Sequence, residues 1–172
     1  MRADKIYLVG FMGAGKTTLA AALGARLHWH VEDLDTVIER REGMTVAEIF
    51  ATHGESRFRT VEQAALEDML PLRQVVVATG GGAFADADSR ALINRDGVSF
   101  WLDVSFDRVV ARLPSEDGQR PLTADRGDME RLFHDRQSAY REAQVRLDAE
   151  HATTAELVER IVDWLEGRPL AR

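Results

Sequence analysis

The sequence predicts an α/β protein, a three-layer α/β/α fold around a central parallel sheet of about five strands. Short apolar runs alternate along the chain with segments of helical periodicity. One run, at residues 75–78, is apolar throughout, as in a strand buried on both faces, and a glycine-rich turn joins the first run to the first helix. With 172 residues, 45% of them hydrophobic, the chain suffices for a single domain, residues 1–172.

Strands are expected where short apolar runs meet turn residues. The first run leads into the glycines of residues 10–15, and the run at 75–78 ends in three successive glycines. The expected strands are residues 5–9, 30–32, 74–79, 98–104 and 145–148.

Helices are expected where apolar residues recur at helical spacing or where a capping box occurs. Leu19, Leu23 and Leu27 give the first helix an inward face. Thr45 and Thr153 are each followed by Glu three residues later, which is the pattern of a capping box. The expected helices are residues 16–27, 37–41, 45–50, 55–70, 87–95, 106–113, 128–143 and 154–166.

Composition excludes several classes of protein. A formal net charge of −7 argues against nucleic acid or an anionic membrane surface as the main partner. The chain has no cysteine, which excludes disulfides, thiolate metal sites and cysteine nucleophiles. The apolar run at residues 6–12 is too short, and too soon broken by glycine, for a signal peptide or a membrane span. We therefore expect a soluble, cytoplasmic, monomeric protein.

The chain is organised around a loop at residues 10–18, GFMGAGKTT, which fits G-x-x-x-x-G-K-[ST] at every fixed position. Glycines let backbone N–H groups wrap a polyphosphate, and the following helix adds its unpaired N–H groups. Lys16 is expected to reach the β- and γ-phosphates of a bound nucleotide, and the Thr17 hydroxyl to coordinate Mg²⁺. The candidate nucleotide-binding residues in this loop are Gly13, Ala14, Gly15, Lys16, Thr17 and Thr18.

The loop alone leaves several classes open, including a glycine-rich turn that merely has the same pattern. Switch GTPases carry N-K-x-D and D-x-x-G, and neither string occurs in this chain. Motor ATPases need a strand that ends in acidic residues, whereas the candidate strand ends in glycines. Small-molecule phosphoryl transfer is the class that remains.

Two aspartates, Asp33 and Asp35, follow the second expected strand and project on the same side. One alternative is that an aspartate caps the helix that follows. The other is a magnesium-facing and a substrate-facing carboxylate.

Three further features are ambiguous by themselves. Arg59 and Glu62, three apart on one helical face, are either a solvated ion pair or part of a site. Arg136 shares the face of apolar residues, so it either extends to solvent or points at a ligand. The glycines at 80–82 are either a flexible turn or a place where a substrate approaches the backbone at a strand end.

Taken together, six stretches resemble the shikimate kinase family, in the nucleoside-monophosphate-kinase-like group of P-loop folds. They are GFMGAGKTT (10–18), DLDTVIE (33–39), IFATHGESRFRTVE (49–62), GGGA (80–83), RPL (120–122) and RQSAYREA (136–143). Each is weak alone, but their order and spacing together are specific. The resemblance implies transfer of the ATP γ-phosphoryl group to the 3-hydroxyl of shikimate, on the pathway to chorismate and aromatic amino acids.

The resemblance also implies roles around the phosphates. Asp33 would hold Mg²⁺ through water, and Asp35 would hydrogen-bond the attacking hydroxyl as base or orienter. Arg120, in a lid at residues 114–127, would neutralise charge on the transferring group, and Arg112 would contact the adenine side. The catalytic candidates are then Lys16, Asp35 and Arg120, and the metal-binding candidates are Thr17 and Asp33.

For shikimate, the resemblance implies a clamp in which Arg59 and Arg136 grip the carboxylate, since a planar guanidinium fits a planar anion. Three glycines would let the ring lie on the backbone, and Glu62 would hold Arg59. The substrate-binding candidates are Asp35, Arg59, Gly80, Gly81, Gly82 and Arg136, within and around a helical segment at 33–62.

The chain departs from the family pattern at Ser138-Ala139, where Pro-Leu is common, and near residues 150–154, to which no base contact is assigned. Two alternatives remain open. A kinase for another small polyol acid, such as gluconate, would lack the three glycines and the paired arginines. A nucleotide-binding module without catalysis is opposed by the intact catalytic candidates.

Overall fold

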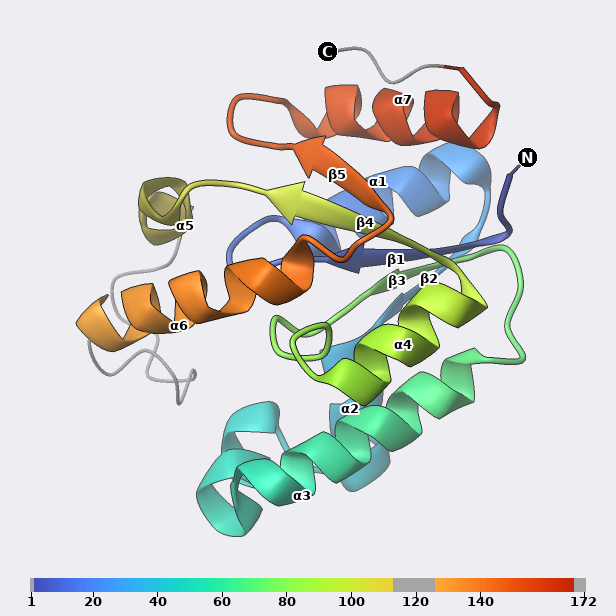
Figure 1. Ribbon diagram of the computed structural model, residues 1–172. Coiled ribbons are helices and arrows are strands. Elements are labelled where there is room, and N and C mark those ends of the chain that lie inside the picture. Colours follow the sequence, from blue (N-terminus) through green and yellow to red (C-terminus); the bar gives the residue numbers. More distant parts are fainter. Residues whose placement is uncertain (1, 113–125, 169–172) are drawn as a thin grey trace.

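The computed structural model describes residues 2–112 and 126–168, in which five parallel strands form one sheet between helices (Figure 1). The strands are β1 Lys5–Val9, β2 His30–Asp33, β3 Val75–Ala78, β4 Val98–Asp103 and β5 Val145–Asp148, in the spatial order β2-β3-β1-β4-β5. The helices are α1 Lys16–Leu27, α2 Leu34–Glu42, α3 Val46–Met69, α4 Ala87–Asp96, α5 Phe106–Arg112, α6 Arg126–Tyr140 and α7 Thr154–Leu165. The predicted fold class is confirmed.

Helices cover both faces of the sheet. α1 and α7 pack against each other on one face, and α3 and α4 pack against each other on the opposite face (Figure 1). Every position of β1 and of β3 is buried, because these strands lie inside the sheet with a helix layer on each side. This is why both strands appear in the sequence as apolar runs rather than as alternating patterns.

The register of the strands brings three loops together. Leu8 of β1 and Asp33 of β2 both pair with Ala78 of β3, so these three strands end at the same level. Parallel strands all point their carboxyl ends at one edge of the sheet, where ligands of open α/β folds bind. The glycine loop after β1, the aspartates after β2 and the glycines after β3 therefore meet at this edge.

α2 begins earlier than the predicted residue 37. Asp33 adopts an extended conformation, and its Oδ1 accepts the backbone N–H groups of Asp35 at 3.1 Å and Thr36 at 3.4 Å. This cap satisfies N–H groups that the first turn of a helix leaves unpaired, so the helix can begin at Leu34. The sequence had left the capping role as one of two alternatives for these aspartates.

Two predicted helices, 45–50 and 55–70, are joined in α3. The predicted capping box at Thr45 is present: its Oγ1 accepts the Glu48 N–H at 3.2 Å, and Glu48 Oε2 accepts the Thr45 N–H at 2.7 Å. At Gly54 the backbone takes φ 77° and ψ 176°, which is not helical, so α3 has two halves with a kink between them. Positive φ is strained for any residue with a Cβ, so glycine is needed at the kink.

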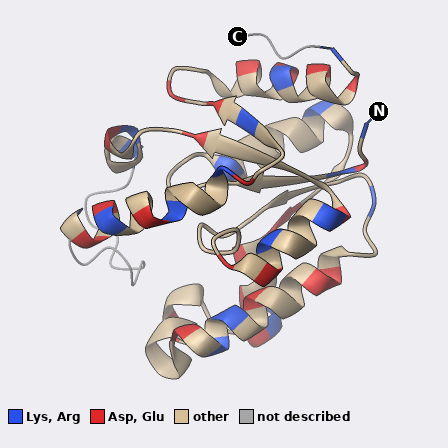
Figure 2. Cartoon of the chain, viewed as in Figure 1, with Lys and Arg blue, Asp and Glu red and all other residues tan. Residues whose placement is uncertain are grey.

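Charged residues of both signs are interspersed along the outer helices (Figure 2). Several form exposed ion pairs between neighbouring elements, such as Arg41 with Asp68 at 2.7 Å and Arg57 with Glu42 at 3.0 Å. In the ranges 2–112 and 126–168, no helix combines the length and apolarity needed to cross a membrane.

Candidate active site

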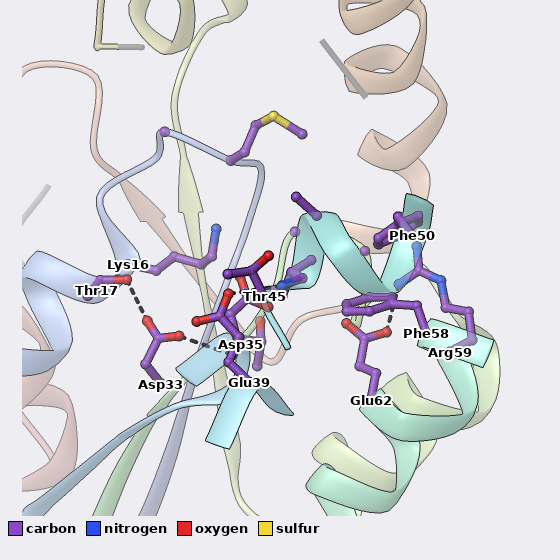
Figure 3. Close-up of a pocket in the computed structure, with 18 of the residues that line it drawn as sticks. Lys16, Thr17, Asp33, Asp35, Glu39, Thr45, Phe50, Phe58, Arg59 and Glu62 are labelled. Carbon is purple, nitrogen blue, oxygen red and sulfur yellow. Dashed lines mark hydrogen bonds and ion pairs between the residues drawn. The ribbon is translucent and has the colours of Figure 1, made fainter. Parts of the chain in front are cut away.

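The carboxyl edge of the sheet borders a cavity of about 930 Å³ (Figure 3). The glycine loop after β1, both halves of α3, the glycines after β3, and residues of α2, α5 and α6 line it. The predicted site residues in its wall are Gly13, Gly15, Lys16, Thr17, Thr18, Asp33, Asp35, Arg59, Gly80, Gly81, Gly82, Arg112 and Arg136. The fold therefore brings nearly all of the candidates to one place.

The glycine loop folds back around the side chain of Lys16. Its Nζ donates to the carbonyl oxygens of Gly10 and Phe11, at 2.8 Å each, and the residue is only 8% exposed. Gly15 precedes α1 with φ 101°, a conformation that glycine adopts without strain. The ammonium is thus held inside the loop, next to the N-terminus of α1. The unpaired N–H groups at a helix N-terminus favour binding of an anion such as a phosphate.

Thr17 and Asp33 form the candidate metal site. Thr17 Oγ1 donates to Asp33 Oδ2 at 2.7 Å, while the other oxygen of that carboxylate caps α2. Proteins commonly bind Mg²⁺ through one or two oxygen side chains together with substrate phosphates and water. The Thr17 hydroxyl and the Asp33 carboxylate are adjacent to each other and next to the phosphate loop, so they fit that set of ligands.

Asp35 lies in the first turn of α2 and faces the glycines after β3. Its Oδ1 is 3.0 Å from the point where a Cβ on Gly80 would be, and Glu62 Oε1 is 3.1 Å from the same point. A side chain at residue 80 would therefore displace two carboxylates. Asp35 lies in the cavity wall with Lys16 and Thr17 of the phosphate loop, as a group acting on the acceptor hydroxyl should (Figure 3).

Arg59 and Glu62 form a partly buried ion pair rather than a solvated one. Arg59 Nη1 donates to Glu62 Oε2 at 2.6 Å, and Nη2 donates to the exposed Glu55 at 3.2 Å. Glu62 is 1% exposed, and burial raises its pKa, with Asp35 adding to the rise and Arg59 opposing it. Glu62 Oε1 accepts no hydrogen bond from the described residues. Glu62 thus holds the guanidinium at the cavity wall, which is the role that the family resemblance implied for it.

The three glycines provide space for charged side chains. A Cβ on Gly82 would be 2.5 Å from Arg59 Nη2, and a Cβ on Gly81 would be 3.4 Å from Arg136 Nη1. None of the three has a positive φ, so the need for glycine here comes from close approach and not from the backbone conformation. The residues that approach include the two arginines themselves.

Arg136 comes from α6 and lies in the cavity wall close to Gly81. It is 7% exposed, and its guanidinium carbon lies 5.7 Å from the centre of the Phe11 ring. Of the two alternatives left by the sequence, the structure has the side chain in the cavity wall and not extended to solvent. The departure at Ser138-Ala139 leaves α6 intact through these positions.

A second cavity, of about 260 Å³, adjoins the phosphate loop and shares Gly15, Thr18 and Arg112 with the first. Arg112 Nη1 donates to the carbonyl oxygen of Ala14 at 2.9 Å, so α5 is tied to the loop. The remaining wall is Ala14, Leu19, Leu102, Ala149, Ala152, Thr154 and Leu157. The sequence assigned no base contact near residues 150–154, because this stretch has no basic residue besides His151; the only signal was its position after the last strand.

Sequence reasoning also missed an aromatic wall of the main cavity. Phe50 and Phe58 both line it, with ring centroids 4.6 Å apart. In a straight helix these residues would be about 12 Å apart along the axis. The kink at Gly54 between them therefore brings the rings together, and the glycine was the only signal of it in the sequence.

Arg120 and most of the expected lid at residues 114–127 lie outside the described residues. Their predicted roles are neither supported nor opposed by the geometry above. The elements that flank this segment, α5 and α6, both contribute an arginine to the cavity, Arg112 and Arg136.

Comparison with known proteins agrees with this geometry. A model of the shikimate kinase family matches residues 12–166. A shikimate kinase from Sulfurihydrogenibium sp. (strain YO3AOP1) is 37% identical over 163 residues, covering 95% of this chain and 98% of that protein. One from Chromobacterium violaceum is 40% identical over 171 residues, covering 97% and 92%. The structure of shikimate kinase from Acinetobacter baumannii in complex with shikimate matches with a TM-score of 0.90 at 32% identity, covering 98% and 96%.

Proposed function

This chain belongs to the shikimate kinase family, and we propose that it transfers the γ-phosphoryl group of ATP to the 3-hydroxyl of shikimate. The products are shikimate 3-phosphate and ADP, on the route to chorismate and aromatic amino acids. The observation that carries the proposal is the placement of Arg59 and Arg136 beside adjacent glycines after β3, in a cavity that the phosphate loop also lines. One cavity thus offers a site for a polyphosphate and a site for a small carboxylate.

On the nucleotide side, backbone N–H groups of residues 13–18 would surround the β- and γ-phosphates, and Lys16 would neutralise their charge. The smaller cavity beside Arg112, walled mostly by alanine and leucine side chains, would take the adenine ring. Thr17 and Asp33 would hold Mg²⁺, which when bound supplies charge neutralisation at the phosphates.

On the acceptor side, Asp35 would accept a hydrogen bond from the 3-hydroxyl and take its proton as the oxygen attacks the γ-phosphorus. One P–O bond forms to shikimate, and the bond from the γ-phosphorus to the β-bridging oxygen breaks, so ADP leaves with the electron pair. Asp35 is suited to this because its helix is capped beside the phosphate loop and its carboxylate lies 3.0 Å from the point where a Cβ on Gly80 would be. Arg120 would neutralise charge on the transferring group.

The carboxylate of shikimate would lie between Arg59 and Arg136. Two planar guanidinium groups can offer paired N–H donors to one planar anion, which a single ammonium cannot do. Glu62 and Glu55 each accept a hydrogen bond from Arg59, which fixes its guanidinium in the cavity wall. The glycines leave room for the ring of the substrate beside the backbone.

Production of ADP from ATP, with and without shikimate, tests the function most directly. We expect release of ADP to depend on shikimate and to be absent with gluconate and other polyol acids in the same panel. Activity with gluconate would favour the sister-kinase alternative. Binding of ATP without any ADP release would favour a nucleotide-binding module.

The proposed reaction also leads to expectations about the ligands of the protein, its oligomeric state and the compartment in which it acts. We expect ATP and shikimate as the ligands, a monomer, no nucleic acid or membrane partner, and a cytoplasmic reaction. Elution at about 19 kDa in size-exclusion chromatography with light scattering would support the monomer.

A further inference from the structure

Tyr140, the last residue of α6, is fully buried at the glycine wall of the main cavity. Its hydroxyl donates a hydrogen bond to the carbonyl oxygen of Gly81. Its ring stacks on Trp101 of β4, with centroids 6.2 Å apart and planes at 28°, and the Arg146 guanidinium lies over the same Trp101 ring. The ring is thus supported by the sheet, and the hydroxyl meets both the Gly81 carbonyl and the side chain of Arg136, which hydrogen-bonds to it.

That carbonyl belongs to the peptide between the two arginines. The Cβ position of Gly81 borders Arg136, and the Cβ position of Gly82 borders Arg59. A trans peptide is planar, so an anchor on the Gly81 carbonyl also sets the direction of the Gly82 N–H on its opposite side. A group that fixes this carbonyl therefore also fixes the segment of backbone that lies next to both guanidinium groups.

The neighbouring carbonyls are held differently. The Gly80 oxygen accepts the Ala83 N–H at 3.2 Å, and the Gly82 oxygen accepts the N–H groups of Ala85 and Asp86 at 3.1 and 3.3 Å. The Gly81 oxygen takes its hydrogen bond from a side chain, that of Tyr140. Glycines have wide backbone freedom, so in this run each such bond removes alternative orientations of a peptide.

The hydroxyl is also kept in its donor form. Burial raises the pKa of Tyr140 to about 12, against the opposing charges of Arg136 and Arg59. At neutral pH the side chain is protonated and can only approach the carbonyl oxygen as a donor.

We propose that Tyr140 is a positioning residue for substrate recognition: its hydroxyl holds the Gly81–Gly82 peptide at the spacing at which Arg59 and Arg136 grip one carboxylate. The proposal rests on the carboxylate clamp of the proposed function. Tyr140 acts through the Gly81 carbonyl and through its hydrogen bond with Arg136, and it makes no contact of its own with the reacting atoms. Removing the hydroxyl should loosen the clamp and leave the phosphate loop as it is.

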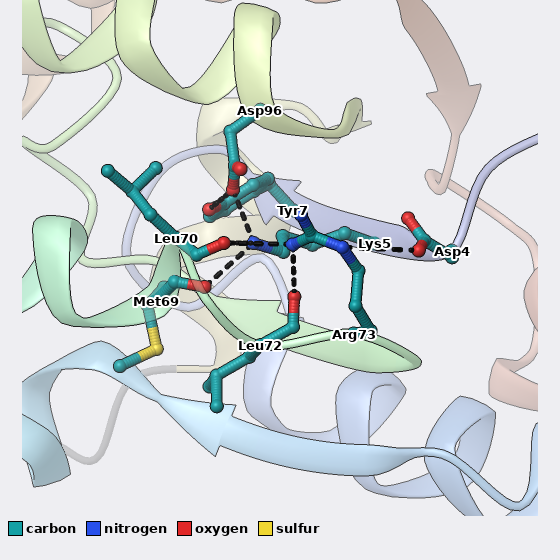
Figure 4. Close-up of polar contacts among 8 residues, drawn as sticks. All are labelled: Asp4, Lys5, Tyr7, Met69, Leu70, Leu72, Arg73 and Asp96. Carbon is teal, nitrogen blue, oxygen red and sulfur yellow. Dashed lines mark hydrogen bonds and ion pairs between the residues drawn. The ribbon is translucent and has the colours of Figure 1, made fainter.

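Tyr7 provides a matched control at the opposite, amino edge of the sheet (Figure 4). Its ring is also buried, and its hydroxyl donates at 2.6 Å to Asp96 Oδ2, which also accepts from Lys5 Nζ at 2.7 Å. Tyr7→Phe and Tyr140→Phe each remove one buried hydroxyl and its hydrogen bonding without changing the size of the ring. Both variants should lose stability, but only Tyr140→Phe should change the site.

The test compares shikimate with its carboxamide, in which a neutral amide replaces the carboxylate. Calorimetric titration without nucleotide gives both affinities for the wild type and the two variants, and titration with ATP reports that each variant is folded. We expect Tyr140→Phe to bind shikimate roughly fivefold to tenfold more weakly, as for one lost hydrogen bond. Its affinity for the carboxamide should change far less, whereas Tyr7→Phe should keep the wild-type ratio of the two affinities.

Steady-state kinetics gives a second readout that a purely structural role would not move. In Tyr140→Phe the KM for shikimate should rise with little change in kcat or in the KM for ATP. Two outcomes would overturn the positioning role. In the first, Tyr140→Phe keeps the wild-type ratio of its affinity for shikimate to its affinity for the carboxamide. In the second, Tyr7→Phe lowers this ratio as much as Tyr140→Phe does. Equal affinities for acid and amide in the wild type itself would refute the carboxylate clamp and therefore the premise.

Discussion

Thr17 Oγ1 donates a 2.7 Å hydrogen bond to Asp33 Oδ2, so one carboxylate joins the end of the phosphate loop to the start of α2. The other oxygen of Asp33 accepts the N–H groups of Asp35 and Thr36. Asp33 therefore faces the candidate metal site with one oxygen and, with the other, positions the helix that carries the candidate base. These two roles can be separated by substitution.

Asp33→Asn should affect the metal and spare the helix. Asparagine keeps a side-chain oxygen for the cap but has no charge, so turnover should need more Mg²⁺ while shikimate affinity without nucleotide stays near wild type. Asp33→Ala removes the cap as well and should lower the free energy of unfolding by about 0.5–2 kcal/mol. Magnesium titration of the activity and urea denaturation measure the two effects. Equal stability of the two variants would mean that the cap contributes nothing.

Lys16→Met and Asp35→Asn should both abolish most turnover, for different reasons. Lys16 acts on phosphate charge, so its loss should weaken ATP binding and the transition state together. Asp35 acts on the acceptor hydroxyl, and loss of general-base assistance typically costs about 10²–10⁴-fold in rate. ATP affinity should survive in Asp35→Asn. Near-wild-type turnover of that variant would remove Asp35 from the mechanism.

Arg136→Ala should raise the dissociation constant for shikimate and leave the constant for ATP nearly unchanged. Truncating one partner of a buried charge pair costs on the order of 2–5 kcal/mol. At about 1.4 kcal/mol per decade this is roughly a 30-fold or larger effect. Arg136→Lys and Arg59→Lys should recover only part of the affinity, since an ammonium lacks the planar fork.

The control for this clamp is Arg57→Ala. Arg57 lies two residues before Arg59 in the same helix, but its side chain is 51% exposed and pairs with Glu42. Its removal should leave shikimate affinity within about twofold of wild type, since exposed ion pairs contribute little. A loss as large as that of Arg136→Ala would point to a general effect of charge rather than to a clamp.

Glu62 should make stability depend on pH in a defined direction. Burial raises its pKa in the folded state above the ordinary glutamate value, so the folded protein binds this proton more tightly than the unfolded chain. The resulting stabilisation is complete below the unfolded pKa, about 4.3. It is lost as pH rises through the folded pKa.

Denaturation over this range of pH, for wild type and Glu62→Gln, measures the contribution as the difference between the two profiles. Glu62→Gln cannot titrate at this position, so its free energy of unfolding should lack the part of the decrease with rising pH that Glu62 causes in the wild type. Glu55→Gln is the matched control, because Glu55 also pairs with Arg59 but is 65% exposed. It should keep the wild-type profile. Parallel profiles for wild type and Glu62→Gln would show that Glu62 does not titrate in this way.

Much of the fold and the nucleotide half of the site could be predicted from the sequence. The phosphate loop is one contiguous stretch, 10–18, whose shape depends on its own glycines and on the strand and helix that flank it. The capping boxes at Thr45 and Thr153 are also local, and both are formed. Asp33 and Asp35 were expected after a strand; Asp33 is the last residue of β2, and Asp35 lies in the first turn of the helix that follows it. In each case the interacting groups are close in the chain.

Family resemblance was needed for the acceptor half. Arg59 and Arg136 had no assignable role from helical spacing alone, because a charged residue on a half-buried face has the same pattern whether it meets solvent or a ligand. What distinguishes the two is the set of groups on neighbouring elements. The resemblance supplied that information from other proteins, and the roles it implies remain predictions.

By itself, then, the sequence determined the order of strands and helices, the phosphate loop and the caps, since periodicity and short-range hydrogen bonds act within a few residues. Only the tertiary structure decided which residues share the site. The kink at Gly54 brings Phe50 to Phe58, and Tyr140 reaches Gly81, 59 positions away. Such contacts depend on how the helices pack over the common edge of the sheet. The spacing of residues along the chain does not determine how far apart those residues lie in the folded protein.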